Sequence, residues 1–360
     1  MTIDEINIIW LDLFNFVGYN KKAKLLEIFK GKDIRHELNS SAVAREILNQ
    51  SEINKMMLAT SDEFLKHKLE KYRADGIEII TIYDNRYPYM LRQTSEPPFC
   101  LYCKGNVQLL NTYCIGVVGS RRVTEYGTIV TKQYTKAFVE NDITVVSGLA
   151  GGVDTIAHKT AIENNGKTIA VLAGGLYHLY PAFNANLAKQ MYVDNLVISE
   201  MNPEIIPASF YFPIRNRIIA GLSHGVLLTE AGEKSGALHT KQYAIDYNRE
   251  IFVVPGRINS EMSKGCNKII KELQGAITLS PDDVLETLGI EKKEKIENQT
   301  SFQLDINQQK LLQFIQSEKR TFQEISDYMN LPANELNSLI MELEVAGLIA
   351  SVGGNSYIMC

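Results

Sequence analysis

The chain has 360 residues and a mass of 40.5 kDa, a length that predicts two or three domains at about 100–200 residues each. Hydrophobic residues make up 45% and charged residues 22%, so the chain can build an ordinary globular core without disulfides or a metal. The 37 Lys and Arg against 42 Asp and Glu leave a net charge of −5, which excludes nucleic-acid binding through bulk basicity. Any such binding requires a local basic patch.

The sequence shows no membrane or secretion signal. No apolar run approaches the roughly 18 residues of a membrane helix, and the first residues, MTIDEINIIW, lack the basic-then-apolar order of a signal peptide. The five cysteines are scattered along the chain, which does not indicate a disulfide framework. We therefore expect a cytoplasmic protein without membrane contact.

Residues 1–75 are predicted to form a small helical domain. Apolar residues recur at spacings of three and four in IIWLDLF, AKLLEIF and EFLKHKLEKY, and Gly18 and Gly31 separate short segments. Short helices in this arrangement suggest a bundle like the SAM or helix-hairpin-helix domains.

From about residue 111 the pattern changes to short, continuously apolar runs. They are CIGVVGS, ITVVSG, TIAVLAGG, NLVISE, GVLLTEA and EIFVVPG, and amphipathic stretches separate most of them. Continuous apolar runs predict strands covered on both faces, and their alternation with helices predicts right-handed βαβ units. Residues 111–289 thus predict an α/β, Rossmann-like, doubly wound sheet, and we take the whole domain as residues 76–289.

The remaining residues are predicted to form a linker and a second small domain. Residues 290–304 are polar and without periodicity, which predicts a linker. In residues 305–360, NQQKLLQFIQ predicts a first helix, and Thr321 with Glu324 forms a capping-box pattern before a second. A third helix follows in NELNSLIMELEVAG, and Gly353-Gly354-Asn355 between LIASV and SYIM predicts a hairpin. This order is that of a winged helix.

The third helix of this winged-helix domain is acidic. It contains Glu335, Glu342 and Glu344 and no Lys or Arg. The corresponding helix normally enters the major groove of DNA, where carboxylates would face phosphates. We therefore expect a protein contact or a structural role rather than duplex binding.

Three glycine-rich turns follow the first three apolar runs. In a doubly wound sheet, ligands bind outside the carboxyl ends of the strands. Glycines allow close backbone approach, helix N-termini offer N–H groups to anions, and arginine adds a fork for phosphate. Tight turn geometry alone is the alternative reason for glycine, but three turns on one edge favour an anion site. The candidate residues are Gly119, Ser120, Arg121, Arg122, Gly148, Gly151, Gly152, Asp154, Gly174 and Gly175.

The segment FYFPIRNR, residues 210–217, places aromatic residues beside two arginines. Rings stack on bases and arginines neutralise phosphates, which is what a groove for single-stranded nucleic acid needs. The alternative is ordinary packing, with the aromatics in the core and the arginines solvated or in ion pairs. The candidates here are Phe212, Arg215, Asn216 and Arg217, together with Lys234, Ser235 and Lys241 after the fifth apolar run.

Catalytic motifs are weak in this sequence. The P-loop and the G-x-G-x-x-G fingerprint are missing, and Gly221–Gly225 matches G-x-S-x-G but with a helix before it and a strand after it, the reverse of a nucleophile elbow. Cys100 and Cys103 lie in an apolar run and predict strand packing. Asp154 is predicted as the N-cap of the helix that carries His158. These patterns predict no catalytic residue, metal or cofactor.

Seven ordered blocks resemble one known family. GVVGSRRVTEYG, VVSGLAGGVDTIAH, TIAVLAGGLYHLYPAFN, ISEMNP, FPIRNRIIAGLS, LLTEAGEKSGALHT and IFVVPG follow one another as in the DNA-processing protein A family (DprA, also called Smf). This resemblance implies a binder of single-stranded DNA, not an enzyme, that protects incoming strands in natural transformation and loads the RecA recombinase. It also implies a homodimer through the Rossmann-like domain, with strand contacts at Gly119–Arg121, Gly148–Asp154 and Arg215–Arg217. A RecA contact is expected around residues 261–273.

Two other functions stay open at this point. Glycine-rich Rossmann-like folds also resemble the cytokinin-activating phosphoribohydrolases, so a nucleotide-binding or nucleotide-hydrolysing enzyme is the alternative. Those enzymes carry a P-G-G-x-G-T motif, whereas the corresponding strand here ends in TEAGEK, residues 229–234, so their catalytic loop is not matched. A winged helix also suggests a transcription regulator, against which the acidic third helix argues.

Overall fold

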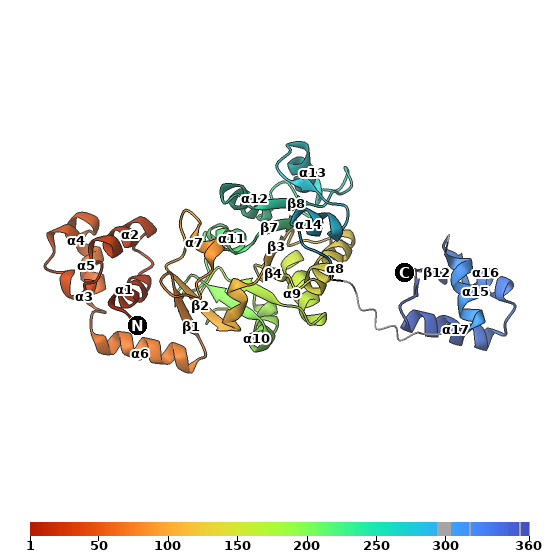
Figure 1. The fold of residues 1–360 in the computed structure, drawn as a ribbon, viewed down its shortest axis with the longest axis horizontal. Helices are drawn as coiled ribbons and strands as arrows, with labels where there is room; N and C mark the ends of the chain where they lie inside the picture. Colours follow the sequence, from red (N-terminus) through yellow and green to blue (C-terminus); the bar gives the residue numbers. More distant parts are fainter. Residues whose placement is uncertain (294–303, 317, 353, 360) are drawn as a thin grey trace. The chain divides into compact units, whose positions relative to one another are not determined.

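The computed structural model describes residues 1–293, 304–316, 318–352 and 354–359 (Figure 1). The chain divides into two compact units, Met1–Lys293 and Glu294–Cys360. Most of the predicted linker, residues 294–303, lies outside the described residues. The domain boundary predicted at residues 75 and 76 falls between the last N-terminal helix and the first strand, and it stays a prediction.

The N-terminal residues form short helices, as predicted. Five of the helix starts in residues 1–75 have a side-chain cap, and at the first of them Thr2 and Glu5 form a reciprocal capping box. The indole of Trp10 lies at the centre of the bundle and donates to the Ala59 carbonyl over 2.7 Å. The helices are α1 (Ile3–Asp12), α2 (Tyr19–Ile28), α3 (Ile34–Glu37), α4 (Ala42–Ile47), α5 (Gln50–Met57) and α6 (Asp62–Ala74).

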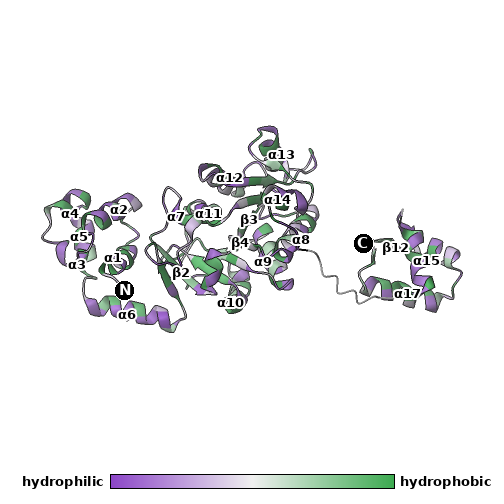
Figure 2. Ribbon diagram, viewed as in Figure 1, coloured by the Kyte–Doolittle hydropathy of each residue, from purple (hydrophilic) through white to green (hydrophobic). Residues whose placement is uncertain are grey.

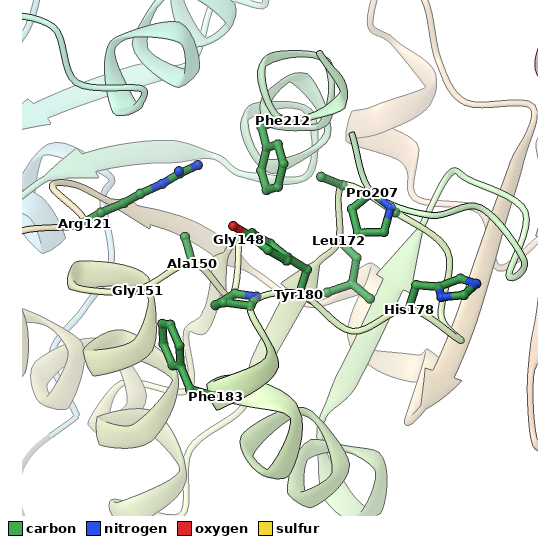
Figure 3. Close-up of a pocket in the computed structure, with 13 residues that line it drawn as sticks. Arg121, Gly148, Ala150, Gly151, Leu172, His178, Tyr180, Phe183, Pro207 and Phe212 are labelled. Carbon is green, nitrogen blue, oxygen red and sulfur yellow. The ribbon is translucent and has the colours of Figure 1, made fainter. Parts of the chain in front are cut away.

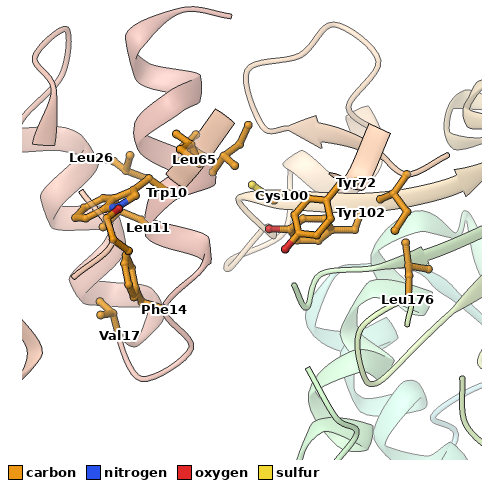
Figure 4. Close-up of a cluster of buried hydrophobic side chains, with 14 of the residues drawn as sticks. Trp10, Leu11, Phe14, Val17, Leu26, Leu65, Tyr72, Cys100, Tyr102 and Leu176 are labelled. Atoms are coloured by element: carbon orange, nitrogen blue, oxygen red, sulfur yellow. The ribbon is translucent and has the colours of Figure 1, made fainter. Parts of the chain in front are cut away.

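The bundle shares one hydrophobic cluster with the sheet that follows it. Figure 4 shows this cluster running from Trp10 and Phe14 through Tyr72 and Tyr102 to Leu176. Helix α6 in Figure 2 carries both hydrophobic and hydrophilic residues, as an amphipathic helix does. The N-terminal helices are therefore packed against the sheet through a continuous core.

Within residues 1–293 the chain forms a nine-stranded sheet in the order β1-β2-β6-β5-β4-β3-β7-β8-β9. The six predicted strands are β3 to β8, and each pairs in parallel with its neighbours among them. Strands β1 and β2 add an antiparallel edge beside β6, and β9 extends the other end in parallel. The strands are β1 (Glu78–Thr81), β2 (Cys100–Gly105), β3 (Cys114–Val118), β4 (Thr144–Ser147), β5 (Thr168–Val171), β6 (Leu196–Ser199), β7 (Gly225–Leu228), β8 (Glu250–Val253) and β9 (Ala276–Ile277).

Helices cover both faces of this sheet, which explains the continuous apolar runs. One face carries α7 (Tyr89–Arg92), α11 (Tyr211–Leu222), α12 (Ala237–Asp246) and α13 (Lys264–Lys271). The other carries α8 (Glu125–Glu140), α9 (Val153–Glu163), α10 (Ala185–Asp194) and α14 (Pro281–Thr287). Short 3₁₀ turns, η1 (Val107–Asn111) and η2 (Ala182–Asn184), complete the unit. The fold is the predicted α/β doubly wound sheet.

The order of the parallel strands reverses between β3 and β7. From β3 the chain runs outward through β4, β5 and β6, and it then crosses to β7 on the opposite side of β3. Loops after these two strands part from each other, and such a switch point is where doubly wound sheets bind ligands.

The second unit has the predicted winged-helix order. Thr321 and Glu324 form the predicted capping box, and the two C-terminal strands pair as an antiparallel hairpin. Strand β10, which no sequence pattern predicted, pairs with β12 in a three-stranded sheet within the described residues. The elements are α15 (Ile306–Ile315), β10 (Arg320–Thr321), α16 (Phe322–Met329), α17 (Ala333–Val345), β11 (Ile349–Ser351) and β12 (Ser356–Met359).

Two further predictions concern cysteines and the membrane. Cys100 and Cys103 are both buried in β2, where burial raises the pKa of each thiol, so their role in strand packing is confirmed. In the part of the chain that the structure describes, no helix combines the length and apolarity needed to span a bilayer.

Candidate nucleic-acid interface

A groove of about 1000 Å³ opens at the switch point, and we call it the switch groove. Its walls are the loop after β3 (Gly119–Arg122), the start of α11 and the loop after β7 (Gly232–Gly236). An apolar pocket of about 260 Å³ adjoins it, with Arg121, Tyr180 and Phe212 lining both (Figure 3). The predicted edge of the sheet therefore carries two connected cavities.

The loop after β3 is held by Glu230 at the end of β7. The Glu230 carbonyl accepts from the Ser120 N–H over 2.7 Å, and its carboxylate accepts from the Thr124 N–H over 2.8 Å and the Thr124 hydroxyl over 2.7 Å. Glu230 is 2% exposed, and a Cβ at Gly127 would lie 2.5 Å from its carboxylate. These bonds fix the loop backbone, so Arg121 and Arg122 are exposed at the groove.

Arg121 points its guanidinium at an aromatic ring rather than at an acid. Its guanidinium carbon lies 5.3 Å from the centre of the Phe212 ring, and Tyr180 meets that ring edge-on at 5.5 Å between centres. Among the described residues, Arg121 and Arg122 form no ion pair. A cation held against a ring in this way keeps its N–H groups available for an anion.

The loop after β4 is closed by Asp154. Its Oδ2 accepts from the Gly148 N–H over 3.1 Å and the Ala150 N–H over 3.3 Å. Helix α9 begins at Val153 with Gly152 as its N-cap, so the predicted N-cap role of Asp154 is wrong. Gly152 has φ of +76°, and a Cβ there would collide with the Ser120 carbonyl oxygen. This glycine lets the two loops touch, and the Asp154 carboxylate bonds to N–H groups of its own loop rather than capping the helix.

Arg215 is a scaffold residue beneath the same loop. It is 4% exposed, and its Nη1 donates to the Gly148 carbonyl over 2.5 Å and also to the Val171 carbonyl. Burial lowers the pKa of its guanidinium to about 10, while the nearby Asp154 favours the charged form. Burial raises the pKa of Asp154, which Arg215 opposes. Its Nη1 donates to two backbone carbonyls and its Nε donates to the Asn216 side chain, so these donors hold the scaffold, although Arg215 also lines the switch groove. A phosphate contact by Arg215 stays a prediction.

Arg217 is held by partners other than those of Arg215. It forms an ion pair with Glu200 and donates to the Glu96 carbonyl over 2.7 Å, and it is 8% exposed. Residues two apart on a helix point about 200° from each other, so both arginines cannot face one groove. We therefore assign Arg215 and Arg217 to the scaffold in place of the paired phosphate contact expected from sequence.

The remaining candidates divide between the cavities and their supports. Gly174 and Gly148 line the apolar pocket, and Lys234, Ser235 and Asn216 line the switch groove. The Asn216 side-chain N–H donates to the Gly236 carbonyl over 3.1 Å and holds the loop after β7. Outside the cavity linings, Gly175 lies against the Asn202 carbonyl, and Lys241 donates to Gln274 over 2.8 Å.

Several residues of the apolar pocket were not found from sequence. His178, Phe183 and Pro207 line it, from the segment after the third glycine turn and from the segment before α11. None lies in a periodic or glycine-rich pattern. The one available signal was aromatic content, since Tyr180 and Phe183 lie within ten residues of Gly174.

The G-x-S-x-G match is structural, as predicted. Ser223 follows α11 and precedes β7, and its buried hydroxyl donates to the Ile219 carbonyl over 2.7 Å.

An α/β doubly wound sheet with an exposed arginine and aromatic rings at its switch point, followed by a winged helix, defines the structural class of this protein. Comparison with known sequences identifies the family. Residues 78–289 match the family described as DNA recombination-mediator protein A, and residues 296–355 match the DprA winged helix domain. The chain belongs to this DprA/Smf family.

Curated relatives and solved structures agree with that assignment. The chain is 40% identical to the DNA processing protein DprA of Bacillus subtilis over 62% of its length and 75% of the relative, and 34% identical to Protein Smf of Escherichia coli over 74% of each. The DprA structure from Streptococcus pneumoniae matches with a TM-score of 0.67 at 33% identity, covering 79% of this chain and 98% of that one. A Helicobacter pylori structure, described for its unique single-stranded DNA binding mode, matches with a TM-score of 0.54 at 29% identity, covering 59% and 95%.

Proposed function

We propose that this protein binds single-stranded DNA along the switch groove and the apolar pocket. The observation that carries the proposal is the exposed Arg121 guanidinium held over the Phe212 ring where the two cavities meet. A backbone phosphate beside the guanidinium and a base beside the ring would both find a partner there. The Helicobacter pylori relative, described as a single-stranded DNA binder, supports the same ligand for this chain.

The charge of the protein agrees with a focused site. Its net charge is −5, so phosphates are repelled by most of the surface and attracted only where cations gather. Arg121, Arg122 and Lys234 line one groove, and Glu233 and Glu261 lie in the same lining. We infer that few phosphates are neutralised and that binding has a modest dependence on salt.

In the cell, we propose that the bound strand is incoming DNA during transformation, which the protein protects and hands to the RecA recombinase. The description of the family as a recombination mediator supports this role. We further propose a cytoplasmic homodimer formed through the Rossmann-like domain, without catalysis. RecA filament formation on DNA coated with single-strand binding protein tests the mediator role, and release of free base from nucleoside monophosphates would contradict the absence of catalysis.

The binding proposal is tested with Arg121→Ala. We expect its affinity for oligo(dT) to fall by more than tenfold, on the order of the 1.5–3 kcal/mol of a charge-assisted contact. Titrations across a salt series should show a slope about 0.7 smaller for the variant, since one phosphate contact on a single strand is lost.

The control is Lys136→Ala, because Lys136 is exposed on α8 and lies outside both cavity linings. It should bind within about twofold of the unchanged protein, the effect expected of a distant charge. If Arg121→Ala and Arg122→Ala are both folded and bind oligo(dT) normally, the site lies elsewhere.

A further inference from the structure

Phe183 is an exposed aromatic side chain inside the apolar pocket. It belongs to η2, it is 73% exposed, and it lines the pocket together with Tyr180 and Phe212. Burial of a phenylalanine side chain stabilises a protein by about 1.5–3 kcal/mol, so this ring contributes little to folding where it stands. Single exposed apolar residues are common, and its meaning therefore depends on how the ring is held.

The ring of Phe183 lies against the backbone of the loop after β4. A Cβ at Gly151 would lie 3.2 Å from the Phe183 Cζ, so the missing side chain of Gly151 provides the seat for the ring. Asn184 anchors the turn next to it, because its side-chain N–H groups donate to the Leu149 carbonyl over 2.9 Å and to the Thr155 hydroxyl over 2.7 Å. Asn184 is 2% exposed. One side of the ring is thus fixed on the protein and the rest is open to solvent.

The pocket carries aromatic rings on two different elements. Figure 3 shows Phe212 from α11 and Phe183 from η2 with Tyr180 between them in that view, and with Arg121 directed toward Phe212. The rest of the lining is largely apolar, with Leu172, Ala173 and Pro207 among its residues. A surface of rings with few hydrogen-bonding groups accepts any base and selects none, as sequence-tolerant strand binding requires.

We propose that Phe183 is a second base-stacking residue, which holds a base of the strand next to the one at Phe212. This inference rests on the proposed function, since it names a further contact for the same ligand. The ligand group is the flat face of a nucleobase, and the phosphate that joins the two nucleotides faces Arg121. Phe183 adds affinity through the base, whereas Arg121 adds affinity through the phosphate.

The test compares two ligands of equal charge. One is a dT 20-mer, and the other is a 20-mer of abasic deoxyribose phosphate, which keeps every phosphate and lacks every base. Phe183→Ala should weaken binding of the dT oligomer by about 5- to 100-fold, the range of one lost base–aromatic stack, and leave the abasic oligomer within about twofold. Arg121→Ala should weaken binding of both ligands.

A matched control and a reporter accompany this comparison. Phe210 is 60% exposed and lies outside both cavity linings, so Phe210→Ala should bind the dT oligomer within about twofold of the unchanged protein. Phe183→Trp should keep the affinity, and its emission should be quenched by the dT oligomer and not by the abasic one. Trp10, the single native tryptophan, is buried in the N-terminal bundle and supplies a constant background.

The outcomes separate this inference from the function on which it rests. If Arg121→Ala weakens both ligands while Phe183→Ala binds dT normally and Phe183→Trp is not quenched, the base contact is overturned and the strand-binding site stands. Equal weakening of both ligands by Phe183→Ala would show that the ring acts through the loop beneath it, which also overturns the base contact. If Arg121→Ala and Arg122→Ala both leave the affinity for both ligands unchanged, the proposed strand-binding site itself fails.

Discussion

Two segments bring arginines to the switch point, and they use them in opposite ways. In the loop after β3, Arg121 and Arg122 are exposed, and in the described part of the chain neither has an acidic partner. In helix α11, Arg215 and Arg217 are buried, and their donors go to carbonyl oxygens and to Glu200. The residue type is the same in both segments, but the partners differ.

The difference arises from what each segment needs for its own folding. The loop backbone is satisfied by Glu230 and Thr124, so its arginines are not required to hold it. The start of α11 lies across the ends of β4 and β5, where Arg215 satisfies carbonyl groups that the strands leave open. An arginine whose donors hold the scaffold has fewer N–H groups to offer a ligand than an arginine without such partners. The loop is therefore the side of the groove on which a phosphate contact is expected.

Removal of Arg217 gives the largest expected effect and tests the scaffold side of this comparison. Arg217→Met leaves the Glu200 carboxylate buried without its partner, so we expect the free energy of unfolding to fall by about 3–5 kcal/mol. Urea unfolding measures the loss. The affinity of the folded protein for oligo(dT) at low temperature should change by less than about twofold, since Arg217 donates to Glu200 and to the Glu96 carbonyl and not to the groove.

Two variants check that interpretation. The double variant Glu200→Leu with Arg217→Met should regain most of the lost stability, because no buried charge is then left unpaired. The free energy of unfolding of Arg121→Met should lie within about 0.5 kcal/mol of that of the unchanged protein, because the substituted side chain is exposed. The comparison breaks if Arg217→Met keeps its stability and loses its affinity for DNA.

A second prediction concerns the stability of the protein in acid, which depends on His158 in helix α9. His158 is fully buried, its Nδ1 lies 2.7 Å from the Thr168 hydroxyl, and burial together with the charge of Arg215 lowers its pKa to about 3. The unfolded chain has a histidine pKa of about 6.5, so below that pH the unfolded state binds a proton that the folded state does not. The contribution of His158 to the free energy of unfolding is therefore constant above about pH 6.5 and is lost as the pH falls toward 3.

The size of this loss can be measured between pH 7 and 5. At about 1.4 kcal/mol for each pH unit below 6.5, His158 accounts for a fall of about 2 kcal/mol over this interval. His158→Gln removes the titrating group, so its free energy of unfolding should fall by about 2 kcal/mol less than that of the unchanged protein. If the free energies of unfolding of the two proteins depend on pH in the same way, the lowered pKa of His158 is refuted.

The sequence predicted the fold better than the site because the two depend on different information. Strands β3 to β8 and the winged helix follow from patterns of burial and capping that are local to each segment. Strand β1 was missed because its run, EIIT, has only four residues, too few to show a period, although Asp75-Gly76 marks a turn before it.

The site was predicted as a place and not as a set of contacts. The switch-point rule located the three glycine turns, and the structure brings Gly119, Arg121 and Phe212 to one groove. Their binding of DNA stays a prediction. The inward direction of Arg215 depends on the carbonyl groups of Gly148, just after β4, and Val171 in β5, 67 and 44 residues away in sequence, which no local pattern reveals. Phe183 was missed for the same reason, since its exposure depends on how η2 packs on Gly151.

The smallest expected loss of stability comes from a contact of the N-terminal helices. This contact tests whether helix α6, like Arg215 and Arg217, serves the scaffold of the groove. The segment between β6 and α11 carries Glu200, and Asn202 within it accepts from the Tyr72 hydroxyl of α6 over 3.0 Å. Tyr72→Phe leaves Asn202 with the Glu204 N–H as its remaining donor. We expect a loss of about 0.5–1.5 kcal/mol in urea unfolding, the net value of one hydrogen bond.

The control for this variant is Tyr177→Phe, and the DNA titration decides what the contact does. Tyr177 donates to Asp75 in an exposed position, so water replaces that bond and the expected loss is smaller than for Tyr72→Phe. Pro207, farther along the segment that Tyr72 holds, lines the apolar pocket. If α6 belongs to the scaffold alone, both variants bind oligo(dT) within about twofold of the unchanged protein. A loss of affinity in Tyr72→Phe without a loss of stability would instead show that α6 sets the shape of the pocket through this segment, and the division between scaffold and ligand contacts would no longer hold.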